Sequence, residues 1–310
     1  MKQGTEKLKY INDINNITTS GRTVIAIGKF DGVHRGHQAL LSRVMEISRA
    51  ESLISTVLTF SGQPVSLVKG IKTAVCMTGK ERSAMIESFG IDQMVELTFD
   101  ESLMNMSAED FIDEILIGKL NAGAVVAGED LSFGKNRRGN AGMLLEKAKE
   151  KGFICEIIPK VMDGDREISS TYVREEIRAG RMKKTAELLG FPYFISGTVK
   201  KDRRVGHTIG FPTLNLFPDE EKLLPPFGVY ASETVFDNKK YVSITNIGTR
   251  PTYGLDKVCV ETYILDYSGD LYGKDVRVDI MEFMRPEIKF ESEDALKKQI
   301  ARDTENRRSV

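Results

Sequence analysis

Apolar runs alternate with helical patterns in the first part of the chain, up to Leu189. Strand-like runs occupy residues 24–27, 56–60, 94–97, 124–127 and 153–158, with amphipathic stretches between them. The clearest helix begins at Ser107, a residue suited to an N-cap, and carries Glu109 and Asp110 in its first turn. This alternation predicts a parallel sheet with helices on both faces, and ligands would then gather at the carboxyl ends of the strands.

The pattern changes after residues 189–192. Strand-like runs now follow one another at residues 193–199, 229–236, 241–244, 258–265 and 276–283, separated by turn signals such as Asp237-Asn238. No helical period returns until Ser292, a second candidate N-cap. Consecutive short strands predict an antiparallel barrel or sandwich. We therefore expect an α/β domain at residues 1–188 and an all-β domain at residues 189–310.

Composition limits the class of protein. With 310 residues, 41% hydrophobic and 29% charged, the chain is typical of a soluble globular protein. A net charge of −1 gives no general attraction to nucleic acid or to an anionic membrane, and no signal peptide or membrane helix is visible. Of the three cysteines, Cys155 and Cys259 stand in apolar runs, so we expect buried free thiols and a reducing cytoplasm.

Two of the three histidines stand three residues apart in a glycine-rich string, GKFDGVHRGH, at residues 28–37. The string lies between the 24–27 strand and a helix whose apolar positions begin at Leu40, so His34 and His37 flank a helix N-terminus. Free N–H groups and the positive dipole end favour a phosphate there, and two imidazoles could donate hydrogen bonds to its oxygens. A zinc site is a weaker interpretation because two histidines supply half of a tetrahedral shell. In the alternative interpretation, the histidines bind no ligand and only stabilise the glycine-rich turn.

Two further sequence motifs in the first half place polar groups at the end of a predicted strand and at the start of a predicted helix. GEDLSFG at residues 128–134 follows the 124–127 strand, and Asp130 could accept hydrogen bonds from a ligand or belong to an ordinary acidic turn. ISSTYVR at residues 168–174 reads as a helix start, in which Ser169 or Ser170 is the cap and Arg174 lies one turn on. Hydroxyls, free N–H groups and a guanidinium together suit a phosphate, although a plain capped helix has the same pattern.

The second half has its own concentrated motif, GHTIGFPTLN, at residues 206–215. Thr213 and Asn215 are two residues apart, so on an extended segment they face the same side and offer hard oxygen ligands to Mg²⁺. Glu261 stands in a strand-like run in which Val260 and Thr262 take the opposite face. A carboxylate there could deprotonate a primary alcohol for attack on a γ-phosphate, or simply face solvent.

These strings resemble those of one enzyme family in the same order along nearly the whole chain. FDGVHRGH resembles the nucleotide-binding signature of prokaryotic FAD synthetases, within the HxGH nucleotidyltransferases, and GFPTLN resembles the riboflavin kinase signature. The chain is identified as a member of the bifunctional riboflavin kinase/FMN adenylyltransferases. This resemblance implies a Rossmann-like HxGH domain that adenylylates FMN to FAD, and an antiparallel β-barrel that phosphorylates riboflavin to FMN with Mg–ATP.

The resemblance also assigns roles to residues of this sequence. The catalytic residues it implies are Glu261, His34 and His37, and the Mg²⁺ ligands are Thr213 and Asn215. The nucleotide-binding residues are Gly28, Phe30, Asp31, Gly32, Gly36, Ser170, Thr171, Arg174, Gly210 and Pro212. The residues that line the flavin or nucleotide are Asp130, Phe133 and Arg285.

The sequence departs from the family pattern at three positions. Gly62 replaces a proline in the loop after the 56–60 strand, Asp202 replaces a glycine, and His207 replaces an arginine. A more flexible loop at Gly62 favours a second hypothesis, a riboflavin kinase whose first half no longer transfers adenylyl groups. A third hypothesis, a flavin-sensing regulator without turnover, would require lost catalytic residues, yet all of them are present.

Overall fold

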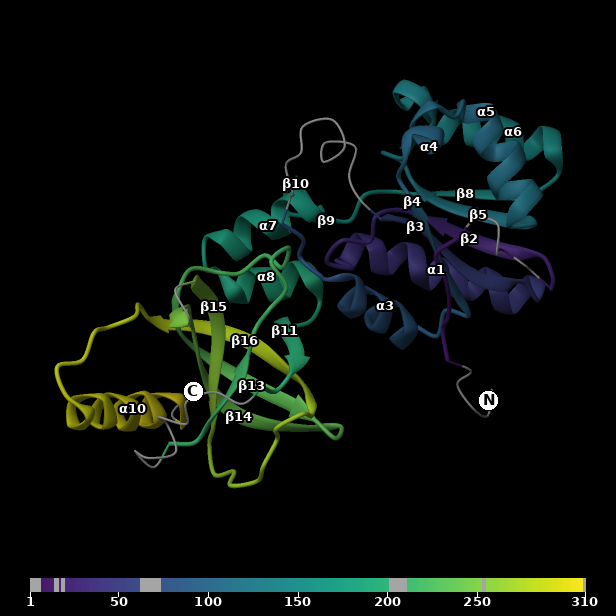
Figure 1. Ribbon diagram of the computed structural model, residues 1–310. Coiled ribbons are helices and arrows are strands. Elements are labelled where there is room, and N and C mark those ends of the chain that lie inside the picture. Colours follow the sequence, from purple (N-terminus) through teal and green to yellow (C-terminus); the bar gives the residue numbers. More distant parts are fainter. Residues whose placement is uncertain are drawn as a thin grey trace. The chain divides into compact units, whose positions relative to one another are not determined.

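The computed structural model describes residues 7–13, 17, 20–61, 74–200, 211–252 and 255–308 (Figure 1). Gly62, Asp202, His207 and Gly210 lie outside these residues. The chain forms two compact units, Met1–Ser170 and Thr171–Val310. No helix among the described residues is long and apolar enough to cross a membrane.

The first unit is built on a six-stranded parallel sheet in the order β1-β4-β3-β2-β5-β8. Its elements are β1 (Lys9–Ile11), β2 (Thr23–Ile27), α1 (Arg35–Glu51), β3 (Ile54–Ser61), α3 (Gly79–Ser88), β4 (Gln93–Thr98), α4 (Glu101–Asn105), α5 (Ala108–Asp110), the π-helix η2 (Phe111–Lys119), β5 (Ala122–Gly128), β6 (Ser132–Phe133), η3 (Lys135–Arg137), β7 (Gly139–Asn140), α6 (Ala141–Lys151), β8 (Ile154–Ile158), β9 (Met162–Asp163) and β10 (Arg166–Glu167). The parallel sheet predicted from the alternating pattern is confirmed.

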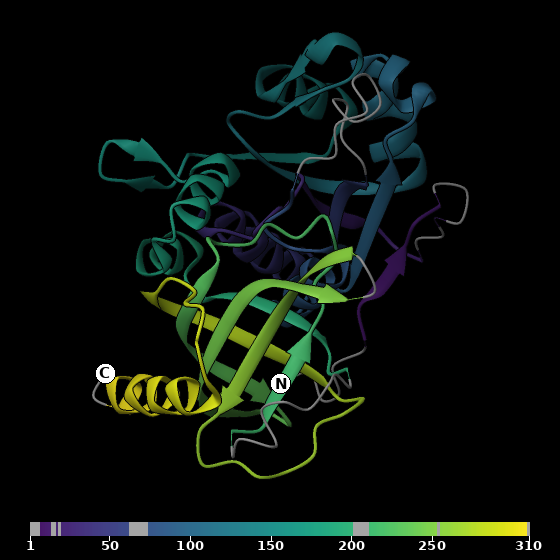
Figure 2. The ribbon, with the colours of Figure 1, turned by 60° about the vertical axis from the view of Figure 1, so that its left-hand side comes forward.

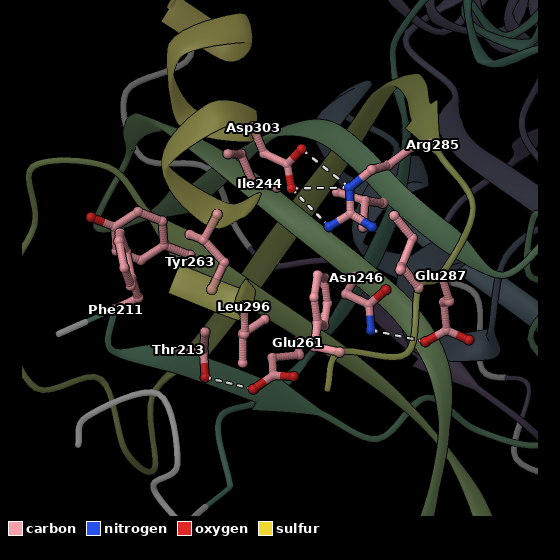
Figure 3. Close-up of a pocket in the computed structure, with 14 residues that line it drawn as sticks. Phe211, Thr213, Ile244, Asn246, Glu261, Tyr263, Arg285, Glu287, Leu296 and Asp303 are labelled. Carbon is pink, nitrogen blue, oxygen red and sulfur yellow. Dashed lines mark hydrogen bonds and ion pairs between the residues drawn. The ribbon is translucent and has the colours of Figure 1, made fainter. Parts of the chain in front are cut away.

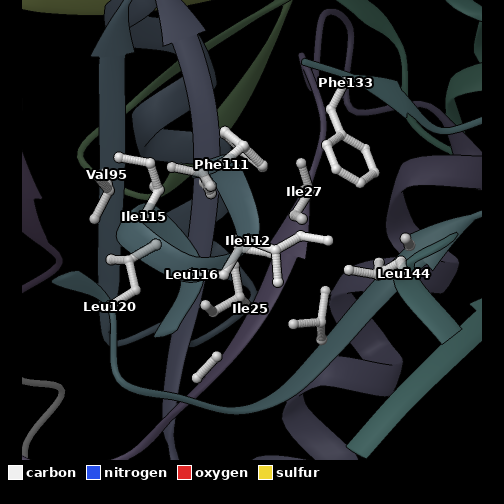
Figure 4. Packing of buried hydrophobic residues seen from close by; sticks show 14 of the residues in the cluster. Ile25, Ile27, Val95, Phe111, Ile112, Ile115, Leu116, Leu120, Phe133 and Leu144 are labelled. Carbon is white, nitrogen blue, oxygen red and sulfur yellow. The ribbon is translucent and has the colours of Figure 1, made fainter. Parts of the chain in front are cut away.

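Helices cover both faces of this sheet, as predicted (Figure 1). On one face, Ile25 and Ile27 of β2 join a buried cluster with Ile112 and Leu116 of η2 and with Leu144 of α6 (Figure 4). On the other face lies α1, whose buried side chains Leu40, Leu41, Val44 and Ile47 repeat at helical spacing. The two layers fix β2 and α1, and therefore the turn between them.

The second unit is an antiparallel sheet in the order β11-β16-β13-β14-β15-β12. Its elements are α7 (Ser170–Arg178), α8 (Met182–Leu189), β11 (Tyr193–Thr198), β12 (Thr213–Leu216), β13 (Gly228–Phe236), β14 (Lys239–Thr252), β15 (Leu255–Ile264), β16 (Asp275–Arg285) and α10 (Glu293–Arg308). The sheet curls into a partly closed barrel (Figure 2). Just beyond β11, the Lys200 N–H donates to the Asn215 carbonyl at 3.0 Å, which brings the first and last strands of the order together.

The structure refines three of the sequence predictions. Ser107 caps its helix as predicted, with its hydroxyl accepting the Asp110 N–H at 3.0 Å, but the helix continues as the π-helix η2. The strand predicted at 241–244 is longer, running from Lys239 to Thr252. Cys259 is buried as expected, but Cys155 is only partly buried because its strand, β8, is at the edge of the sheet.

Candidate functional sites

The first site is the turn that joins β2 to α1. Phe30, Gly32 and Val33 have φ angles of 51°, 85° and 42°, so the backbone is left-handed through the turn. This conformation is costly for a β-branched residue such as Val33, and strain of this kind clusters at functional sites. His34 is the N-cap of α1 and has extended backbone angles. The turn therefore places a helix N-terminus at the carboxyl edge of the parallel sheet.

The two histidines of the turn stack against each other. The ring centroids of His34 and His37 are 3.8 Å apart at an interplanar angle of 24°, and Phe30 lies 5.0 Å from His37. His34 is buried, and a Cβ added to Gly36 would lie 3.2 Å from its ring, so any larger residue at this position would push against the ring. Burial lowers the pKa of His37 well below 6.5, and the neighbouring His34 lowers it further. His37 is therefore neutral at neutral pH, with one ring N–H to donate.

Asp31 stabilises the turn from inside. Its buried carboxylate accepts the backbone N–H groups of Cys76 at 2.8 Å and Met77 at 3.2 Å. Its carbonyl accepts the Ser170 hydroxyl at 2.8 Å. Three segments distant in sequence thus meet at the histidine turn, and the contacts of Asp31 and Ser170 hold the backbone that carries His34.

The other nucleotide-site residues predicted in the first half lie on separate elements. Thr171 is exposed and Arg174 is half-buried on the first turns of α7, within the second unit. Gly28 directly follows β2, and a Cβ there would lie 3.2 Å from the Phe30 ring.

The GEDLSFG segment divides between surface and core. Asp130 is exposed in the turn after β5, and a Cβ on Gly128 would come within 2.9 Å of its carboxylate. Phe133 is buried in the core, with its ring centroid 5.3 Å from that of Phe111. Phe133 therefore anchors this segment in the hydrophobic core, whereas the Asp130 side chain faces solvent.

The second site is a cavity of about 200 Å³ between the outer face of the curled sheet and α10 (Figure 3). Its polar side chains are Thr213, Asn246, Glu261, Arg285, Glu287 and Asp303. Its apolar side chains are Phe211, Val229, Ile244, Tyr263, Ile288, Phe290, Leu296 and Ile300. A polar floor beside an apolar wall suits a small ligand that has one apolar part and one polar part.

Strand register aligns the polar floor. Glu261 of β15 is opposite Asn246 of β14 and Asn215 of β12, so the three side chains emerge on the same face. The Thr213 hydroxyl donates to Glu261 Oε1 at 2.8 Å, and Asn246 Nδ2 donates to Glu287 Oε1 at 3.1 Å. Asn215 is buried beside this row, and its Oδ1 accepts the Cys259 thiol at 3.4 Å.

The opposite face of β15 confirms the predicted alternation. Val260 and Thr262 are fully buried in the barrel interior, and the Thr262 hydroxyl bonds to that of Thr245 at 2.9 Å. This bond continues a buried chain of hydroxyl groups through Ser232. Glu261 therefore points out of the barrel, into the cavity.

Several cavity residues were not predicted as site residues. Asn246 and Glu287 line the cavity, and the sequence motifs assign no role to either side chain. Leu296, Ile300 and Asp303 repeat at spacings of four and three residues on α10, a signal that identifies one helix face. Of the predicted residues, Thr213, Glu261 and Arg285 line the cavity, whereas Pro212 is half-buried next to it.

Comparison with known proteins identifies both units. The sequence model of the FAD synthetase family matches residues 16–172, and that of the riboflavin kinase family matches residues 189–310. A bifunctional riboflavin kinase/FMN adenylyltransferase of Escherichia coli K12 is 35% identical over 300 residues, covering 96% of each chain. One from Listeria monocytogenes is 33% identical, covering 92% of this chain and 91% of the other.

A solved structure is similar along the whole chain. It comes from Streptococcus pneumoniae, is titled a macrolide-efflux protein, and superposes with a TM-score of 0.87 at 29% identity, covering 98% of this chain and 100% of that one. Both family models match in order, and full-length relatives share about a third of the residues. The chain belongs to the bifunctional riboflavin kinase/FMN adenylyltransferase family.

Proposed function

We propose that the chain makes FAD in two steps, each in its own domain. Residues 189–310 phosphorylate riboflavin with ATP to give FMN and ADP. Residues 1–188 transfer the adenylyl group of a second ATP to FMN, giving FAD and pyrophosphate. The observation that best supports the proposal is the cavity in which the Thr213–Glu261 pair faces an apolar wall.

In the kinase step, Glu261 is the general base. Its carboxylate takes the proton of the riboflavin primary alcohol, the alcohol oxygen forms a bond to the γ-phosphorus, and the bond from that phosphorus to ADP breaks. The apolar wall, which includes Ile244, Leu296 and Ile300, would hold the flat ring system and so aim the ribityl chain at Glu261.

Thr213 and Asn215 would hold Mg²⁺ with the phosphates of ATP. A hydroxyl and an amide oxygen on one side of β12 are hard donors, which is the chemistry this cation prefers. Mg²⁺ bound there would neutralise charge on the phosphates. Gly210 and Pro212 precede these ligands and would bring the backbone of the same loop to the nucleotide.

In the adenylyl step, His34 and His37 stabilise charge on the α-phosphate. An FMN phosphate oxygen attacks the α-phosphorus and pyrophosphate leaves, while the imidazoles donate hydrogen bonds to the α-phosphate oxygens. The neutral state of His37 leaves it a donor rather than a fixed cation. Gly28, Gly32 and Gly36 let the backbone approach the nucleotide closely.

The other predicted residues have supporting roles in this step. Ser170, Thr171 and Arg174 would clamp the phosphates of ATP. Asp130 would bind the flavin or nucleotide directly, and Phe133 would hold the Asp130 segment in place. We place the enzyme in a reducing cytoplasm, because its three cysteines are free thiols.

Product identity tests the two steps separately. Riboflavin with Mg–ATP should give FMN and ADP, and FMN with Mg–ATP should give FAD and pyrophosphate. ADP formation without pyrophosphate formation would support a riboflavin kinase whose first domain is inactive, the alternative that Gly62 motivates. Tight flavin binding without either product would support the sensor instead.

A further inference from the structure

The last helix is tied to the sheet by a buried ion pair at one end of the cavity. Asp303 of α10 is 3% exposed, and Arg285 is the last residue of β16. Arg285 Nε lies 3.1 Å from each Asp303 carboxylate oxygen, and Nη2 lies 2.8 Å from Oδ2. Gln299 Nε2 adds a fourth bond to Asp303, at 2.9 Å. A fork-to-carboxylate pair of this kind fixes direction as well as distance.

The guanidinium of Arg285 makes its hydrogen bonds within the protein. Its Nε and Nη2 bond to Asp303, and its Nη1 donates to the Pro286 carbonyl at 3.1 Å. Three of its five N–H groups are therefore engaged within the protein, and two of these three hold α10 through Asp303.

Asp303 shares a helix face with two apolar residues of the cavity wall. Leu296, Ile300 and Asp303 all line the cavity, at a spacing that places them on one side of α10. Figure 3 shows the Arg285–Asp303 pair at one end of the cavity and the Thr213–Glu261 pair at the other. A shift of α10 would move Leu296 and Ile300, its part of the apolar wall, while leaving the catalytic end on β12 and β15 in place.

We propose that Asp303 is a positioning residue for riboflavin. Through Arg285 it holds Leu296 and Ile300, the part of the apolar wall that α10 supplies, in position for the flavin ring to pack on them. This inference rests on the proposed kinase function of the cavity. It requires that the ion pair govern riboflavin affinity and not ATP affinity, since the ATP ligands lie at the other end.

The test is Asp303→Asn in the full chain. Titration of riboflavin without ATP, followed by flavin fluorescence, should show a dissociation constant raised about 10- to 100-fold, as expected when a charged hydrogen bond is lost. The riboflavin KM should rise in parallel, while the ATP KM stays within about twofold. Hydrogen exchange in residues 293–308 should become faster, because α10 is no longer held to β16.

A second ion pair on the same helix provides the matched control. Arg308 Nη2 lies 2.7 Å from Asp266, and both side chains are exposed. Asp266→Asn should therefore change neither the dissociation constant nor the KM for riboflavin. Arg285→Lys keeps the charge but loses the fork, and should give an intermediate riboflavin affinity. If Asp303→Asn does not fold, the riboflavin affinity of Arg285→Lys tests the proposal instead.

Riboflavin affinity equal to wild type in the folded variant would overturn the proposal, as would an equal rise in both KM values. Since the binding measurement needs no turnover, this outcome is distinct from a failure of the proposed function, in which wild-type protein makes no FMN.

Discussion

The hydroxyl of Thr213 donates a 2.8 Å hydrogen bond to the carboxylate of Glu261, joining β12 to β15 at the cavity floor. Because the hydroxyl hydrogen points to the carboxylate, a cation would meet only the oxygen lone pairs of Thr213. The same bond holds Glu261 in one orientation. A single contact thus links the residue proposed to bind Mg²⁺ with the residue proposed to take the proton.

Replacing Glu261 by glutamine tests the base. The amide keeps the shape and can still meet Thr213, but it cannot take a proton. We expect FMN formation to fall about 10²- to 10⁴-fold, the usual contribution of a general base. FAD formation from supplied FMN should be unaffected, and near-normal kinase activity would make Glu261 a structural strand residue.

His34→Ala tests the adenylyl-transfer site, first alone and then in a mixture with the separate Glu261→Gln variant. FAD synthesis from FMN should fall about 10²- to 10³-fold, as when one preorganised transition-state donor is lost, while kinase activity stays normal. Neither variant alone should take riboflavin to FAD, but an equal mixture should, since FMN released by one is used by the other. A mixture that remains inactive would contradict two independent sites.

Gly36→Ala tests whether the packing of the histidine rings matters. The new Cβ would lie 3.2 Å from the His34 ring, so the stacked pair must shift. We expect FAD synthesis to fall about 10-fold or more, because small displacements of catalytic groups are costly. The control is Gly79→Ala, a helical site with no atom within 4 Å of the new Cβ, which should behave as wild type.

His37 should make the first domain sensitive to acid. Its folded pKa lies well below 6.5, so below that pH the unfolded chain binds a proton that the folded chain does not. Its contribution to stability is complete above pH 6.5 and is lost as the pH falls toward the folded pKa, by up to about 1.4 kcal/mol per pH unit.

Thermal unfolding of wild type and of His37→Gln between about pH 7.5 and pH 5 measures the pH-dependent contribution of His37 to stability. The wild-type midpoint should fall more steeply with acid than that of the variant. Parallel curves would show that His37 does not titrate as its burial requires.

Most of the fold could be predicted because the hydrophobic pattern determines it locally. The run at residues 24–27 became β2, and Leu40, Leu41, Val44 and Ile47 are all buried on α1. The partial exposure of Cys155 could not be predicted, because an apolar run does not reveal that its strand lies at a sheet edge.

The candidate sites were predictable where their residues are close in sequence. Thr213 and Asn215 share one strand, and His34 and His37 share one turn. The Arg285–Asp303 pair joins residues 18 apart through the docking of a helix on a sheet, which local spacing does not encode. The inward burial of Phe133 likewise depends on the distant Phe111.

The central claim is that one chain carries both activities, and a chromatographic time course tests it most directly. Purified protein is incubated with riboflavin, ATP and Mg²⁺, and riboflavin, FMN and FAD are separated at intervals. We predict that FMN appears first and that FAD follows at its expense. A reaction that forms no FMN, or one that stops at FMN even at high enzyme concentration and with either oxidised or reduced flavin, would contradict the account.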